Sequence, residues 1–109
     1  MVVCKEMQKL RDWLDQHSIP WEDCSEYIGL FFDSWVCRTH FMADNHKVSV
    51  INGYGTYGGF SFFENNNEGL LEVMSDIIND GEPIGFLTAD ELIKILQDQC
   101  HLEGAKEDI

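Results

Sequence analysis

The segment from residue 46 to residue 63 places four glycines between two stretches that each have the pattern of a β-strand. In the first stretch, Val48 and Val50 alternate with more polar residues, which is the period of a half-buried strand. The second stretch, residues 60–63, is rich in phenylalanine, an aromatic residue that favours strands. Glycines this dense indicate backbone that needs positive φ or a close approach to a neighbour: Gly53, Gly55, Gly58 and Gly59. The two stretches are therefore predicted to pair as the centre of an antiparallel sheet.

Helical patterns flank this segment on both sides. Apolar residues recur at helical spacing along one face of residues 3–17, and Pro20 ends that helix because the residue before a proline avoids the helical region. Near the other end, Thr88 and Glu91 form a capping box, the signature of a helix N-terminus. Leu87 and Leu92 have the spacing of a hydrophobic staple. A second helix is therefore predicted to begin after Thr88.

Strands and turns fill the region before the glycines. Residues 34–41 alternate as a strand, and residues 42–45 are predicted to form the hairpin loop that leads to His46. Residues 22–26 are predicted to form a connecting turn. The apolar run 27–32 fits either a strand or a short buried coil, because periodicity cannot separate these for so short a piece.

The region after the glycines is predicted in the same way. Residues 64–69 are polar and end in glycine, which indicates a loop, and residues 79–83 have turn chemistry. Residues 70–78 fit both a helix and a strand template, and a strand at 70–74 is favoured because it follows two predicted strands. The fold class is therefore α+β: one domain with an antiparallel sheet of three to four strands and an N-terminal and a C-terminal helix packed on one face.

The charge of the chain is strongly unbalanced. Twenty acidic residues face seven basic ones, a net charge of −13 at pH 7. This field repels nucleic acid and anionic membranes and attracts basic partners. We expect a cytoplasmic protein, because no run approaches the roughly 18 apolar residues of a membrane span and no apolar leader is present. In that reducing setting the four cysteines, for which three disulfide pairings are possible, are expected to be free thiols: Cys4, Cys24, Cys37 and Cys100.

One motif suggests nucleotide chemistry but lacks its context. Residues 53–58 match G-x-G-x-x-G, yet a strand pattern follows where a dinucleotide site needs a helix to hold the pyrophosphate. The kinase form of the motif needs a lysine and further elements that the chain lacks. We therefore expect a glycine-rich bend, no cofactor and no enzymatic activity.

A metal site is an alternative. Cys37 and His40 are metal-ligand types that lie three residues apart, and His46 could join them. Positions i and i+3 of a strand point to opposite faces, so Cys37 and His40 could reach one ion only with a bulge. A small metal-binding or enzymatic domain that uses these three residues therefore stays open as a second hypothesis, and a homodimer joined through a sheet edge as a third.

Four segments carry a resemblance: SVINGYGTYGG at 49–59, GLLE at 69–72, GFLTADE at 85–91 and CRTHF at 37–41. They resemble small uncharacterised acidic proteins of gut Firmicutes and their phages or mobile elements, and the likeness spans most of residues 5–97. The motifs have no assigned chemistry and transfer no functional residue. By size and charge, small proteins of such elements include anti-CRISPR inhibitors, so the resemblance implies a cytoplasmic binder that blocks a basic nucleic-acid groove.

The leading prediction is a non-enzymatic acidic binding protein that docks onto a basic nucleic-acid-binding protein, such as an RNA-guided nuclease, and competes with nucleic acid as a mimic. Three Trp, three Tyr and seven Phe are more large rings than a core of this size is expected to bury. Aromatic residues left on an acidic surface are typical of a protein interface. The predicted contact residues are Tyr54, Tyr57, Asp76, Asp80 and Glu82.

Overall fold

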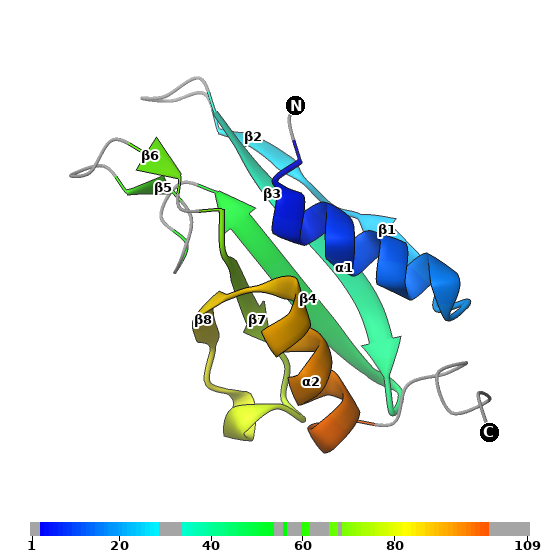
Figure 1. Ribbon diagram of the computed structural model, residues 1–109. Helices are drawn as coiled ribbons and strands as arrows, with labels where there is room; N and C mark the ends of the chain where they lie inside the picture. The colour runs from blue at the N-terminus through cyan, green and yellow to red at the C-terminus, as the bar shows by residue number, and fades with distance from the viewer. Residues whose placement is uncertain are drawn as a thin grey trace.

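The chain folds as an α+β structure with one main antiparallel sheet and two helices (Figure 1). The computed structural model describes residues 3–28, 34–53, 56, 60–61, 66–67 and 69–100. Helix α1 (Lys5–Gln16) and helix α2 (Ala89–Gln99) lie beside each other over the same face of the sheet (Figure 1). No helix in the described part of the chain is long and apolar enough to span a bilayer.

The main sheet has six strands, and all of its pairs are antiparallel. The order is β1-β3-β4-β7-β8, and β2 pairs with β3 further along the same edge as β1. The strands are β1 (Trp21–Asp23), β2 (Glu26–Ile28), β3 (Ser34–Ala43), β4 (His46–Gly53), β7 (Leu71–Met74) and β8 (Ile84–Leu87). The expectation of three to four strands is therefore wrong. The strands predicted at 34–41 and 70–74 are confirmed, and β3 extends to Ala43 because the hairpin turn needs only Asp44 and Asn45.

The predicted pairing of residues 46–53 with residues 60–63 is also wrong. Strand β5 (Phe60–Ser61) pairs with β6 (Asn66–Asn67) in a separate two-stranded sheet, and β4 pairs instead with β3 and β7. The eight paired residues of the β3–β4 hairpin occupy one side of β4, and the strand β7 takes the other. Most of the glycine-rich bend, including Tyr54 and Tyr57, lies outside the described residues.

Gly53 shows why this segment needs a glycine. It stands opposite Val36 in the β3–β4 ladder. A Cβ at this position would lie 2.7 Å from the Val36 Cα and 2.8 Å from the Trp35 carbonyl oxygen. The backbones approach so closely that only glycine fits, as the sequence predicts for this position.

The core lies between the helices and the face of the sheet that they cover. Strand alternation sends every second residue of β3 and β4 to that face, where Phe41, Val48 and Val50 are buried. The large helix residues that are fully buried against them are Met7, Leu10, Leu14, Leu92 and Leu96. Neither helix of the described part of the chain covers the other face of the sheet (Figure 1).

The capping box of α2 is confirmed. The Thr88 hydroxyl accepts a hydrogen bond from the Glu91 N–H at 3.2 Å, and the Glu91 carboxylate accepts one from the Thr88 N–H at 2.9 Å. The Glu6 carboxylate of α1 accepts a bond from the Ala89 N–H at 2.7 Å, so a side chain of α1 satisfies another donor at the start of α2.

Removing the Thr88 hydroxyl tests the contribution of this cap. Thr88→Ala is expected to lower the free energy of unfolding by about 1 kcal/mol, because the Glu91 N–H loses its acceptor. Urea denaturation measures the change, and Thr88→Ser, which keeps the hydroxyl, is the control. Equal stability of the Ala and Ser variants would show that the cap contributes nothing.

Candidate functional site

A turn between β7 and β8 projects acidic side chains away from the body of the protein. Asn79, Asp80 and Gly81 all have positive φ, at 51°, 54° and 87°. Asn, Asp and Gly are the residues that adopt this left-handed conformation most readily, so the sequence at this point encodes the turn. The prediction of a turn at 79–83 is confirmed by the 3₁₀ turn η1 (Asn79–Gly81).

The turn is fixed to the end of α2. The Gln99 side-chain oxygen accepts a hydrogen bond from the Asn79 N–H at 3.3 Å. The last turn of α2 contains no basic residue, so the partial negative charge of the helix C-terminus is not neutralised there. This partial charge adds to that of the Asp80 and Glu82 carboxylates beside it.

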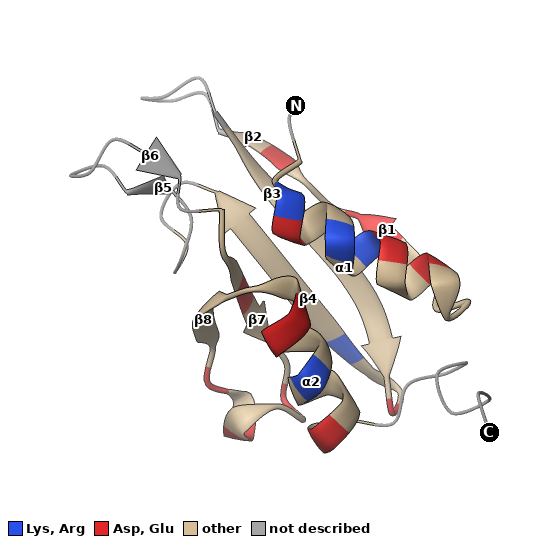
Figure 2. Ribbon diagram, in the orientation of Figure 1, with Lys and Arg blue, Asp and Glu red and all other residues tan. Residues whose placement is uncertain are grey.

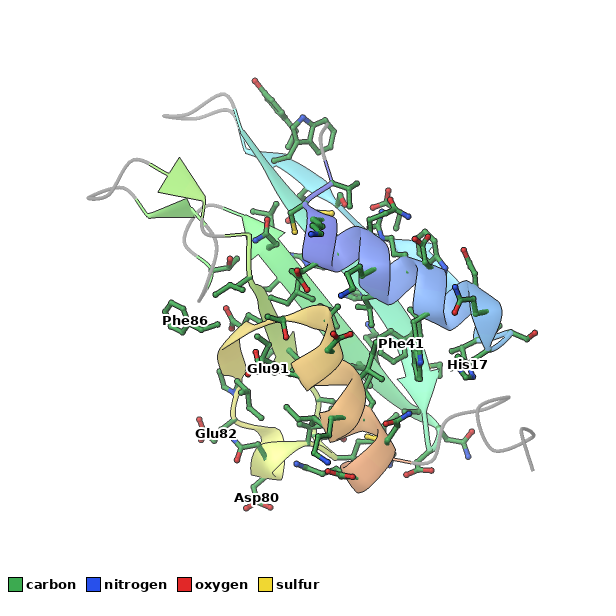
Figure 3. The ribbon with its side chains drawn as sticks, viewed as in Figure 1. His17, Phe41, Asp80, Glu82, Phe86 and Glu91 are labelled. Atoms are coloured by element: carbon green, nitrogen blue, oxygen red, sulfur yellow. The ribbon has the colours of Figure 1, made fainter. Side chains whose placement is uncertain are left out.

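Three of the five predicted contact residues lie along this part of the protein. Asp76, Asp80 and Glu82 are all exposed. The His46 Nδ1 lies 3.0 Å from an Asp76 carboxylate oxygen. Asp80 and Glu82 project outward from one margin of the molecule (Figure 3). The other two predicted residues, Tyr54 and Tyr57, lie outside the described part of the chain.

Negative charge is not confined to this margin. Acidic residues also occur on α1, α2 and the strands β1, β2 and β7 (Figure 2). The segment that carries this margin is distinguished by its sequence, because from residue 48 to residue 93 it contains no Lys or Arg. In α1, by contrast, acidic residues alternate with Lys5, Lys9 and Arg11. This uneven distribution of Lys and Arg can be seen in the sequence, but the net charge of the whole chain does not show it. In space, His46 contacts Asp76, and Lys47 lines a hollow together with Asp76.

Two large apolar side chains stand exposed on the same two strands. Phe86 of β8 is 57% exposed and Met74 of β7 is 51% exposed. A shallow hollow of about 380 Å³ is lined by Met74, Asp76 and Gly81 together with Lys47, Ser49 and Ser75. We define the acidic margin as Met74, Asp76, Asp80, Glu82 and Phe86.

Phe86 also has an unusual backbone. Its φ is 59°, a value that bulky side chains rarely adopt. A left-handed residue costs about 1–2 kcal/mol, and an exposed ring offsets little of that cost by burial. Locally unfavourable conformations of this kind are enriched at binding sites. The sequence predicts no element for residues 84–86, because they have no strand alternation, and sequence reasoning therefore missed Phe86.

The three residues of the metal hypothesis are not brought together. Cys37 faces the helices, is 3% exposed and lies 3.6 Å from an Arg11 guanidinium nitrogen. His40 points to the opposite face of the sheet, as alternation requires, and His46 contacts Asp76. Among the described residues, no group of three or more His, Cys, Asp or Glu side chains is arranged to hold a metal ion.

The four cysteines are free thiols. Burial is the main cause that raises the pKa of the Cys4 and Cys100 thiols, so these two are less reactive than an exposed cysteine at neutral pH. Burial also lowers the pKa of His40, helped by the positive charges of Lys47 and Arg38, so its imidazole is neutral at pH 7.

Comparison with family models, curated proteins and solved structures gave no match for this chain. The function is therefore argued from the residues and their geometry.

The cost of the Phe86 backbone can be measured with a matched pair of variants. Phe86→Gly and Phe86→Ala both remove the ring, but only glycine adopts φ near 59° without a penalty. The Gly variant is expected to be more stable than the Ala variant by about 1 kcal/mol in urea denaturation. An Ala variant as stable as the Gly variant would mean that residue 86 is not held in the left-handed region.

Proposed function

We propose that this protein is a non-enzymatic binding protein that docks its acidic margin onto a cationic surface of another protein. The observation that supports the proposal is the margin itself. It joins exposed carboxylates and two exposed apolar side chains, in a stretch of sequence without Lys or Arg, with the end of α2, whose last turn contains no basic residue.

The two kinds of side chain have different tasks in this proposal. Exposed carboxylates guide a positively charged partner and speed association, but each adds little affinity, because water and salt screen it. Phe86 and Met74 supply the burial, worth roughly 1.5–3 kcal/mol for each side chain that the partner covers completely. A strained, exposed aromatic residue beside acidic groups has the character of an interface hot spot.

The partner that this chemistry fits is a basic nucleic-acid-binding protein. A groove that binds phosphates contains rows of Lys and Arg. The carboxylates of the acidic margin can form ion pairs with those side chains in place of the phosphates of nucleic acid. The narrower version of the proposal is an anti-CRISPR-like inhibitor that blocks an RNA-guided nuclease. Net charge and the resemblance stated above support this version.

The other two hypotheses have less support. An enzyme or metal-binding domain built on Cys37, His40 and His46 would need these residues to converge. Cys37 and His40 lie on opposite faces of the sheet, and His46 lies at the start of β4, where it contacts Asp76. A homodimer through an edge of the main sheet would use β8 at one edge, or β1 and β2 at the other. Strand β8 is an irregular edge, because its register with β7 shifts between Leu71 and Val73, and irregular edges resist strand addition.

Binding to purified basic proteins tests the proposal. The panel contains an RNA-guided nuclease with its guide and several DNA-binding and RNA-binding proteins, and affinity is measured at about 0.1 M and 0.5 M salt. We expect binding to at least one member, weaker at the higher salt. The variant Asp80→Asn/Glu82→Gln/Phe86→Ala should lose at least about tenfold in affinity, or 1.4 kcal/mol.

The matched control is Asp12→Asn/Glu26→Gln, which removes the same charge from exposed positions away from the margin. This control should keep most of the affinity, and nucleic acid should compete with the wild-type protein for the partner. Salt-insensitive binding, or an equal loss in both variants, would contradict the proposal. Absence of binding across the whole panel would also contradict it, and light scattering of the protein alone would then test the homodimer.

A further inference from the structure

A second surface feature lies on the sheet face that the helices leave uncovered. Where β1, β3 and β4 run side by side, there is a hollow of about 420 Å³. Its lining includes Pro20, Glu22, Cys24, His40, Met42 and Lys47. This volume lies within the range of small-molecule sites, roughly 300–1,000 Å³. None of these residues belongs to the acidic margin.

The strand register fixes how the charged groups of the hollow are arranged. Glu22 of β1 stands opposite His40 of β3, and Met42 of β3 stands opposite Lys47 of β4. Strand β3 therefore forms the floor, with the carboxylate on one side and the ammonium group on the other. Neighbouring strands are about 4.8 Å apart, so the strands that carry Glu22 and Lys47 are separated by about 10 Å.

The two opposite charges do not neutralise each other within the protein. Neither Glu22 nor Lys47 forms an ion pair with another residue in the described ranges, although the chain contains many possible partners. The floor between them is neutral at pH 7, because His40 is uncharged there and Met42 is apolar. The hollow thus presents one negative and one positive group across an uncharged floor.

We propose that this hollow binds a small zwitterion with an apolar side chain, namely a free α-amino acid of the aliphatic or thioether type. The ligand ammonium contacts the Glu22 carboxylate, the ligand carboxylate contacts the Lys47 ammonium, and the apolar side chain lies against Met42 and Pro20. This inference stands independently of the proposed partner binding.

The dimensions agree with this ligand. The nitrogen and the carboxyl carbon of an α-amino acid are about 2.5 Å apart. With a charge-assisted hydrogen bond of about 2.8 Å at each end, the ligand and its contacts span about 8 Å. Glu22 and Lys47 lie on strands about 10 Å apart and are offset by two residues, about 7 Å, along β3, so their Cα atoms are about 12 Å apart. The span of the ligand and its contacts fits between their two side chains, which extend over the hollow. A ligand with only one of the two charges leaves the other charged residue without a partner.

Titration with three related ligands tests the inference. Leucine has both charges, leucinamide lacks the carboxylate and N-acetylleucine lacks the ammonium group. Nuclear magnetic resonance follows the ring protons of His40 and the methyl group of Met42. We expect leucine to shift both signals saturably, and the two blocked ligands to bind at least about tenfold more weakly.

Variants of the two charged residues identify each contact. Lys47→Met should weaken leucine binding at least about tenfold and leave leucinamide binding unchanged, because leucinamide already lacks that contact. Glu22→Gln should weaken leucine in the same way and leave N-acetylleucine unchanged. The controls Lys94→Met and Glu72→Gln remove like charges elsewhere on the protein and should change nothing. An unchanged backbone amide spectrum confirms that each variant is folded.

Two results would overturn the inference. One is the absence of saturable shifts at His40 and Met42 with leucine up to about 10 mM, which corresponds to an interaction weaker than about 3 kcal/mol. The other is equal binding of leucine, leucinamide and N-acetylleucine, which would show an apolar contact without recognition of charge.

Discussion

A buried guanidinium group determines how α1 sits on the sheet. Arg11 is only 5% exposed, and a charged group is buried at high cost unless its donors are paired. Its Nε donates to the Thr39 hydroxyl at 2.8 Å, and one terminal nitrogen lies 3.3 Å from an Asp23 carboxylate oxygen and 3.4 Å from the Arg38 carbonyl oxygen. The guanidinium also lies 4.7 Å from the centre of the Trp21 ring. One side chain of α1 therefore holds both β1 and β3.

This interaction explains why the short edge strand β1 stays in place. Asp23 is held from both sides: Ser25 donates to its carboxylate, and Arg11 approaches the same oxygen. The hydrogen bond from Ser25 is the largest cause that lowers the pKa of Asp23, with a smaller contribution from Arg11. Trp21 donates its indole N–H to Asp15 of α1 at 2.8 Å. Glu22, which lies between Trp21 and Asp23 in β1, faces the uncovered side of the sheet, where it lines the hollow.

The sequence predicts the parts of the fold that depend on local chemistry. Both helices follow from apolar spacing and a capping box, and β3, β4 and β7 from alternation or length. Residues 22–26 are predicted to form a turn, because their composition is turn-like, and residues 27–32 fit either a strand or a coil. Pairing with β3 makes strands of β1 and β2. The partner of β4 was assigned wrongly for a similar reason, since local pattern does not show which strands meet.

The same division applies to the candidate sites. Asp76, Asp80 and Glu82 could be selected from the sequence as exposed residues, because the Asn-Asp-Gly turn indicates that the neighbouring side chains face solvent. The left-handed backbone of Phe86 could not be selected in this way, because residues 84–87 form the strand with the irregular register to β7. The hollow brings together residues 20–24, 40–42 and 47 only after three strands are aligned. Long-range register, which alternation alone does not encode, creates both features.

The substitution Arg11→Lys tests the role of the buried guanidinium most directly. Lysine keeps the charge but has a single nitrogen, so it cannot reach Thr39, Asp23 and the Arg38 carbonyl together. The account predicts that Arg11→Lys lowers the free energy of unfolding by at least about 2 kcal/mol in urea denaturation, and that amide protons of β1 exchange faster with solvent. A variant within about 0.5 kcal/mol of the wild-type protein, with unchanged exchange in β1, would contradict it.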